Sequence, residues 1–422
     1  MRPSPAAMST PANTAPTKTA SPLRLTALLC LAEVLVMLNN AFPALLPQFQ
    51  TEWRLNNGEL GWLSGMYYGG YVLATLPLVA LTDARDPRRI YLWAALLCAV
   101  SSLAFALLAG GFWSALGLRV LGGVGLAGTY MVGLRILTDR TEGRTQSRAI
   151  AFYTSHFAIG NAASVWVAGA AARWIGWQGA YHLAAIGAAL ALLILLFAVA
   201  PAATAEKPVH WRQALDLRPA LRNRRALGYN LAYACHGWEL FAFRSFLVSF
   251  LVFAASGRGL PLGLAATDLA GLVLLLGLPG SVGGNELVHR FGRERVIAGV
   301  MFGSALLGLA VAGSAAGPFW LFLPLLACYG LSVAGESAAV TGGAVAAAAS
   351  GRRGATLAVH SILGFAVAAP APVVFGYLLD LGGGEGEGGA WLLAFAALSI
   401  GVALGPLLLA MMLRPRPGKP AP

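Results

Sequence analysis

The chain has 422 residues, of which 58% are hydrophobic and only 11% are charged, and its mean hydropathy is +0.70. A water-soluble protein carries about twice that share of charged side chains, so the composition excludes an ordinary soluble domain. The net charge is +12, but the basic residues lie mainly in particular connections between the apolar runs. This distribution is a signal of membrane topology and argues against a nucleic-acid-binding protein.

Apolar runs recur along the whole chain and predict an all-α integral membrane protein. About 20 helical residues cross a hydrocarbon core of about 30 Å. Charged and Gly/Pro-rich breaks place twelve transmembrane helices near residues 23–47, 60–82, 90–110, 112–137, 148–173, 178–201, 226–255, 266–289, 295–314, 318–346, 354–379 and 391–413. We expect two six-helix bundles, at 23–201 and at 226–413.

The remaining segments are polar and are predicted to be cytoplasmic. Residues 1–22 form a disordered tail, residues 202–225 a linker, and residues 414–422 a second tail. Most of the 29 Lys and Arg residues lie in these segments and in the even-numbered connections, whereas the opposite connections hold only Arg54, Arg173 and Arg258. The positive-inside rule therefore places both termini in the cytoplasm. Sparse lysine with abundant Ala and Gly favours a bacterial inner membrane.

The two halves of the chain repeat at a shift of about 206 residues. At this shift Glu33 falls on Glu239, the loop at 83–89 falls on the loop at 289–295, and Ala149 falls on Ala355. Six helices followed by six of the same orientation form a parallel repeat. Such repeats place the substrate site near the membrane midplane, between the halves.

Two short motifs identify a family resemblance. The connection after the second helix carries Asp83, Arg88 and Arg89, and the fourth helix carries Arg119 followed by glycines at 122, 123 and 125. With these motifs the chain resembles the major facilitator superfamily of secondary transporters over nearly its whole length. The resemblance implies two rocking six-helix bundles. It also implies that Arg119 takes part in proton handling if this chain is proton-coupled.

The chain departs from the family patterns at several positions. Val79, Ala84 and Asp86 differ from the usual residues of the first motif, and His289 replaces the acid in its second copy. The fifth helix offers only Gly-Asn-Ala-Ala-Ser at 160–164, without the proline of the antiporter motif. This last departure disfavours a drug/proton efflux antiporter.

Three carboxylates lie inside predicted helices, at Glu33, Glu239 and Glu336. An uncompensated carboxylate is costly in lipid, so such residues indicate a functional site. We assign proton coupling to these three acids together with Arg119. The alternative is a structural role, in which each is a neutral acid bonded to a backbone carbonyl.

The seventh helix has the richest polar content. His236 and Glu239 are three residues apart, share a helix face and are expected to form a hydrogen-bonded pair. Arg244 points elsewhere and is expected to pair with another helix or to extend outward to the membrane surface, with substrate contact as the alternative. The candidate substrate contacts are His236, Arg244, Trp238, Tyr67, Tyr130 and His360. Packing for the aromatic rings and satisfied core positions for the histidines are the alternatives.

Charged residues at the cytoplasmic helix ends are predicted to form a gate. Ion pairs between the halves would hold that side shut and break as the halves rock, and Arg135 is a candidate partner for Asp83. The predicted gate residues are Asp83, Arg88, Arg89, Arg135, Glu286, Arg290 and Arg293. A purely topological role for the arginines is compatible with this one.

Together these features predict a secondary active transporter, not an enzyme, that moves a small organic solute by alternating access coupled to protons. The expected partners are a small-molecule substrate, protons and the lipid bilayer, with no nucleic acid. No ATP-binding loop and no metal-ligand spacing of the four cysteines is found, so no cofactor is predicted. An uncoupled facilitator or a transporter-like sensor are the alternatives. Three acids suit a cation or a proton cycle, whereas Arg119, Arg244 and His236 suit an organic anion, so the substrate charge stays open.

Overall fold

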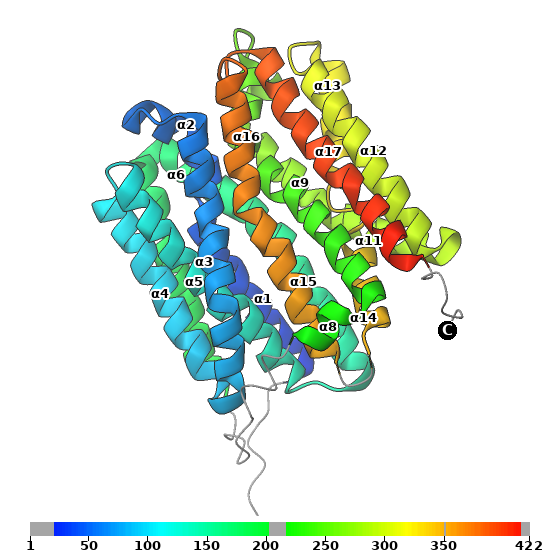
Figure 1. The fold of residues 1–422 in the computed structure, drawn as a ribbon. Helices are drawn as coiled ribbons and strands as arrows, with labels where there is room; N and C mark the ends of the chain where they lie inside the picture. The colour runs from blue at the N-terminus through cyan, green and yellow to red at the C-terminus, as the bar shows by residue number, and fades with distance from the viewer. Residues whose placement is uncertain (1–20, 202–216, 350–351, 415–422) are drawn as a thin grey trace, which may run out of the picture.

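The computed structural model describes residues 21–201, 217–349 and 352–414 (Figure 1). Every regular element in these ranges is a helix, and ten described segments are long and apolar enough to cross a membrane. One of them, at 148–198, has 51 residues, and non-helical backbone at Gly176 divides it into two crossings. Adding α3 (Asn57–Ala84) to this set confirms the twelve predicted crossings.

The first six crossings come from the N-terminal half. The chain enters at Pro22 on one face of the molecule, which we call the terminal face, and first reaches the opposite, distal face near Trp53 (Figure 1). The elements are α1 (Pro22–Met37), η1 (Leu38–Asn40), α2 (Phe42–Trp53), α3 (Asn57–Ala84), α4 (Pro87–Leu108), α5 (Phe112–Thr138) and α6 (Gly143–Ala198). Residues 1–20 and 415–422 of the predicted tails and residues 202–216 of the linker lie outside the described residues, so the domain limits stay predictions.

The last six crossings come from the C-terminal half, which ends on the terminal face after Leu413. A short helix at the end of the predicted linker precedes them. The elements are α8 (Arg218–Arg222), α9 (Arg224–Ala255), η2 (Pro261–Gly263), α10 (Ala266–Leu275), α11 (Gly277–Phe291), α12 (Arg293–Ser314), α13 (Phe319–Ser332), α14 (Ser337–Ala347), α15 (Arg353–Ala368), α16 (Pro370–Leu381) and α17 (Gly388–Leu413).

Several crossings are broken in the middle. The first is interrupted by η1, which places Asn39 and Asn40 inside the membrane-spanning region, and Pro43 starts the next helical segment. The tenth is interrupted between α13 and α14, and Glu336 lies in this break. Transporters use such breaks to expose backbone and polar groups at the depth where substrate binds.

Close packing of glycines joins the two halves. α3 lies against α15 and α16 of the other half (Figure 1). A Cβ atom on Gly61 would lie 2.3 Å from the carbonyl oxygen of Pro372, and one on Gly65 would lie 2.0 Å from that of Ala369. These contacts bring helix backbones together directly, as small residues do in membrane interiors.

A glycine inside the N-terminal half supports a first prediction. A Cβ atom on Gly123 of α5 would lie 1.8 Å from the carbonyl oxygen of Tyr67 in α3, whereas one on Gly117 meets nothing within 4 Å. Replacement of Gly123 by Ala is expected to lower the free energy of unfolding by about 3 kcal/mol, because α5 and α3 must separate. Thermal unfolding in one detergent should show this loss, and Gly117→Ala is the control. Equal melting temperatures for the two variants would contradict the close packing.

Candidate functional site

α9 crosses the centre of the molecule and carries the main candidate residues. Its most apolar window is 78% buried, the highest share among the ten apolar segments. His236, Glu239 and Arg244 keep only 1%, 0% and 8% of their surface exposed. Three ionisable side chains inside one buried helix are costly in lipid, so each needs a partner or a function.

His236 bonds to the helix break in the tenth crossing. Its Nδ1 lies 2.8 Å from Oε1 of Glu336, and both side chains are buried. The predicted pairing of His236 with Glu239 is therefore wrong. The break between α13 and α14 brings Glu336 within reach of His236, a contact that spacing along α9 alone does not reveal.

Glu239 belongs to a separate hydrogen-bonded chain. Its Oε1 accepts a hydrogen bond of 2.9 Å from the Ser304 hydroxyl of α12, which in turn accepts one of 3.1 Å from Ser332 of α13. Its Oε2 is buried without a hydrogen-bond partner among the described residues. This open oxygen is a position where a proton can reside.

Glu33 occupies the matching position in α1. Its side chain is fully buried, and neither carboxyl oxygen has a hydrogen-bond partner within the described part of the chain. The hydroxyl groups of Tyr91, Tyr153 and Thr129 face it. The Tyr153 hydroxyl donates instead to the backbone carbonyl of Tyr130, at 2.8 Å. Both halves therefore bury one acid at the position that the sequence repeat aligned.

Arg244 reaches from the C-terminal half to the N-terminal half. Its guanidinium carbon lies 5.1 Å from the ring centre of Phe157 in α6 and 5.9 Å from that of Phe241. Nε and Nη1 are buried without a hydrogen-bond partner, and no described carboxylate forms an ion pair with the group. A buried, unpaired cation at the boundary of the two halves is a ready site for an anion.

Arg119 is the second buried cation, in the N-terminal half. Its Nε donates to the carbonyl oxygen of Leu63 at 3.0 Å, and its Nη2 donates to Oδ1 of Asn40 at 3.1 Å. The guanidinium also lies 4.3 Å from the ring centre of Tyr67, while Nη1 stays unpartnered among the described residues. Asn40 lies next to Tyr68, which contacts Phe241 across the boundary with ring centres 4.4 Å apart.

The remaining predicted substrate residues lie in other surroundings. Nε1 of Trp238 donates to the carbonyl oxygen of Ala397, so this ring packs between α9 and α17 and not at the boundary. His360 is already satisfied, with Nδ1 3.1 Å from Asn230 and Nε2 3.0 Å from Thr341. Tyr130 packs beside aromatic neighbours of the N-terminal half. The structure therefore does not bring Trp238 and His360 together with Arg244, because they point from their helices toward their own bundle.

Comparison with protein families adds an independent observation. The family model described as Major Facilitator Superfamily matches residues 28–359. This chain belongs to the major facilitator superfamily. The predicted resemblance is confirmed, and the chain is a multi-pass membrane protein of a transporter family. No curated protein matches this chain.

Solved structures of major facilitator transporters share the fold. A bacterial homologue of the human lysosomal transporter Spinster, inward-facing, is 14% identical when unoccupied, covering 93% of this chain and 95% of that one, with a TM-score of 0.67. Its occupied form is 15% identical, and the match covers 93% of this chain and 96% of that one with a TM-score of 0.69. A mutant of the nucleoside transporter NupG is 14% identical, and the match covers 92% of this chain and 100% of that one with a TM-score of 0.75. At this identity the likeness concerns the fold alone.

The hydrogen bonds and ion pairs described for the predicted gate residues on the terminal face lie within one half. Arg88 donates to the carbonyl oxygens of Leu195 and Leu196 at the end of α6, in its own half. Arg135 forms an ion pair of 2.8 Å with Asp139 one turn away. Arg89, Glu286, Arg290 and Arg293 likewise form no hydrogen bond or ion pair across the halves among the described residues. The Asp83 side chain lies outside the described part, so its pairing with Arg135 stays a prediction.

Charged side chains do join the two halves on the distal face. Asp380, near the end of α16, accepts hydrogen bonds from the backbone N–H groups of Asn57 and Gly58, at 3.0 and 2.8 Å, and a third from the Asn57 side chain at 2.8 Å. Arg173 pairs with Asp268 at 3.3 Å. The carboxylate thus caps the start of α3, where the helix dipole favours negative charge. The predicted gate residues include neither Asp380 nor Arg173. Arg173 is one of the few basic residues in the connections on the distal face.

The loop beside this contact predicts a pH effect. Burial raises the pKa of Glu385, between α16 and α17, from 4.5 to about 7, and the nearby Asp380 adds to the shift. A raised pKa in the folded state stabilises the protein fully below pH 4.5, and this stabilisation is lost as the pH rises through 7. The melting temperature should fall over this window, and Glu385→Gln should remove part of the fall. An unchanged slope in the variant would contradict this assignment.

Proposed function

We propose that this protein is a proton-coupled secondary transporter for a small organic solute with an anionic group. The observation that carries this proposal is Arg244, a buried guanidinium at the boundary of the halves, two of whose nitrogens have no hydrogen-bond partner in the described part of the chain. Leaving such a charge unpaired in lipid costs several kcal/mol, which a bound anion offsets. Aromatic rings at Phe157 and Phe241 border the guanidinium and suit an apolar solute body.

The surroundings of Arg244 support an anion over a cation. A second cation is linked to this region, because Asn40 accepts a hydrogen bond from Arg119 and bonds to Tyr68, whose ring contacts Phe241 beside Arg244. The buried acids occupy other positions, with Glu336 bonded to His236 and Glu239 bonded to Ser304. A cationic solute at Arg244 would meet like charge with no carboxylate to compensate it. The substrate charge that composition left open is therefore assigned as negative in this proposal.

Proton coupling is proposed for Glu33, Glu239 and Glu336, with Arg119 in the role that the family resemblance implies. Each carboxyl group is fully buried, and each keeps at least one oxygen without a hydrogen-bond partner among the described residues. A buried carboxyl group gains or loses a proton with a large change in its interaction with lipid and protein, which is what coupling needs. The bond between Glu336 and His236 offers a second proton position at 2.8 Å.

Alternating access is proposed to run between this conformation and one that is open on the distal face. The Asp380 contact to α3 and the Arg173–Asp268 pair hold the distal face together here and would break in the other state. The positive-inside pattern makes the terminal face the cytoplasmic one, in a bacterial inner membrane. The ion pairs predicted for Asp83 and its companions would form when that face closes.

The proposal is tested by transport into vesicles. Purified protein is reconstituted, and uptake of radiolabelled aromatic and aliphatic carboxylates is compared with uptake of their amides and of matched amines. We expect uptake of at least one carboxylate and none of its amide. Uptake restricted to amines would overturn the anion assignment. Solute flux that ignores an imposed pH gradient would favour the alternative, an uncoupled facilitator.

A further inference from the structure

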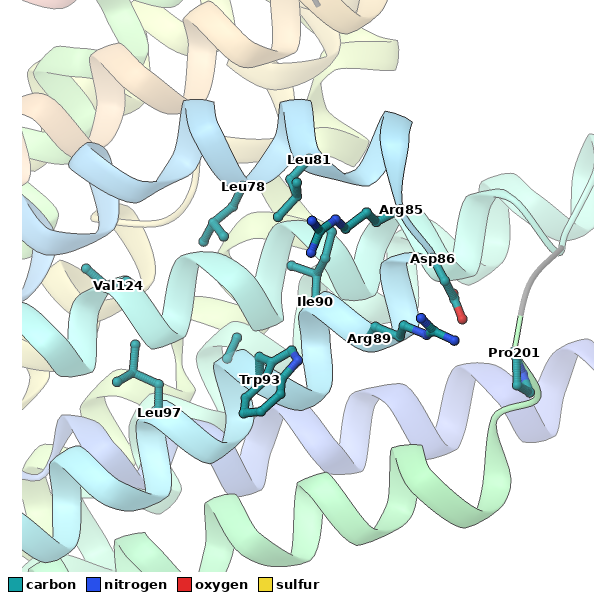
Figure 2. A pocket seen from close by; sticks show the side chains of 11 residues that line it. Leu78, Leu81, Arg85, Asp86, Arg89, Ile90, Trp93, Leu97, Val124 and Pro201 are labelled. Carbon is teal, nitrogen blue, oxygen red and sulfur yellow. The ribbon is translucent and has the colours of Figure 1, made fainter. Parts of the chain in front are cut away.

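A pocket outside the boundary of the halves lies between α3, α4 and α5 near the terminal face (Figure 2). Its volume is about 490 Å³. One wall is apolar, Asp86 and Arg89 lie on the side of Pro201, and the Arg85 side chain extends toward Leu81 and Ile90 in this view (Figure 2). The apolar wall consists of Leu78, Leu81, Ile90, Trp93, Leu97 and Val124.

The apolar wall is open to the lipid. Trp93 is 71% exposed and Leu81 is 36% exposed, and both belong to helices that cross the membrane. Exposed aromatic and aliphatic side chains on such helices contact acyl chains, not water. The pocket therefore runs from the acyl region to the end of the bundle where the charged side chains lie.

The described residues that line the charged end are two arginines and one acid, which gives them a net positive charge. Arg85 and Arg89 are exposed and form no hydrogen bond or ion pair within the described residues. Asp86 is only 7% exposed, and its Oδ1 accepts a hydrogen bond from the backbone N–H of Arg88, so this carboxylate caps α4. The Arg88 side chain is occupied by carbonyl oxygens of α6. Two guanidinium groups are thus available to an anion.

We propose that this pocket binds an anionic phospholipid, with its phosphate at Arg85 and Arg89 and one acyl chain along the apolar wall. Guanidinium groups bind phosphate oxygens in bidentate fashion, and basic pockets between membrane helices suit anionic headgroups. A free phosphate would use the arginines but leave the apolar wall bare. The inference depends on this pocket alone and stands whether or not the proposed transport is correct.

Lipid competition in native mass spectrometry tests the proposal. The delipidated full chain in detergent is given equal amounts of phosphatidylglycerol and phosphatidylcholine with identical acyl chains. We expect the phosphatidylglycerol adduct to exceed the phosphatidylcholine adduct about fivefold or more. Arg85→Gln/Arg89→Gln should remove this preference. Arg352→Gln/Arg414→Gln deletes the same charge from exposed positions of the other half and should retain it.

Two further arms keep the result decisive. Arg85→Lys/Arg89→Lys preserves the charge and should keep most of the preference, which separates loss of charge from loss of folding. Equal binding of both lipids by the wild type would overturn the proposal. So would equal loss of preference in the two double glutamine variants, or full displacement of phosphatidylglycerol by an excess of inorganic phosphate.

Discussion

Replacement of Arg244 by Gln is expected to reduce uptake of the carboxylate substrate about 100-fold. Among the described residues, this guanidinium forms no ion pair at the boundary of the halves, so the substitution removes the charge that is proposed to hold the anion. Loss of one partner from a buried charge pair costs about 3 kcal/mol, which corresponds to that factor. Initial uptake rates at several substrate concentrations should show the loss mainly as weaker apparent affinity.

Two companion variants make the Arg244 result specific. Arg244→Lys keeps the charge without the planar fork and should retain about a tenth of the wild-type uptake. Arg295→Gln removes an exposed arginine from the terminal end of α12 and should transport normally. Wild-type uptake by Arg244→Gln would remove the basis for an anionic substrate. Equal losses in Arg244→Gln and Arg295→Gln would point to a general effect of charge.

Replacement of Glu239 by Gln is expected to abolish accumulation driven by a pH gradient while leaving exchange of labelled for unlabelled substrate within about threefold of wild type. Glutamine resembles the protonated acid, and its amide oxygen can keep the 2.9 Å hydrogen bond from Ser304. It cannot release a proton, so the carrier can return only when loaded. Parallel assays of gradient-driven uptake and of exchange separate the two activities.

The control for this variant is Glu142→Gln, at an exposed position before α6. It removes one carboxylate of the terminal face and should leave both uptake and exchange unchanged. Gradient-driven accumulation by Glu239→Gln at the wild-type level would contradict a proton role for this residue. Loss of exchange as well as accumulation would indicate that Glu239 serves packing instead.

The helices and their repeat could be predicted because they depend on local composition. A span needs about 20 apolar residues whatever its neighbours, and charges mark its ends. The alignment of Glu33 with Glu239 depends only on the spacing of the two residues in the sequence, and both side chains are fully buried in the structure. Arg244 stood out for the same reason, as a charge within an apolar run.

The partners of these residues could not be predicted, because they depend on where helices break and meet. His236 bonds to Glu336 across 100 residues only because the tenth crossing is interrupted before Ser337. Trp238 faces α17 although it is adjacent to Glu239 in sequence, since neighbouring helical positions point about 100° apart. Sequence periodicity in a span that is apolar on all sides does not say which face meets which helix.

The ion pairs predicted on the terminal face stay a prediction, for a different physical reason. An alternating-access protein has two sets of contacts between its halves, and one conformation satisfies only one of them. This structure forms the distal set, in which Asp380 caps α3, and that carboxylate lies at a helix end where sequence alone suggests a surface residue. The clusters of Arg on the terminal face do not by themselves indicate a gate, because topology as well as gating sets the number of Arg residues there.

Proton coupling is tested most directly by measuring proton and solute movement in the same vesicles. The wild-type protein is reconstituted with a pH-sensitive dye inside, and a transported carboxylate is added without any imposed gradient. We expect a change of internal pH that starts when the solute is added, is proportional to the solute taken up, and is absent with the amide analogue. Carboxylate uptake that leaves the internal pH constant would contradict proton coupling and identify a facilitator.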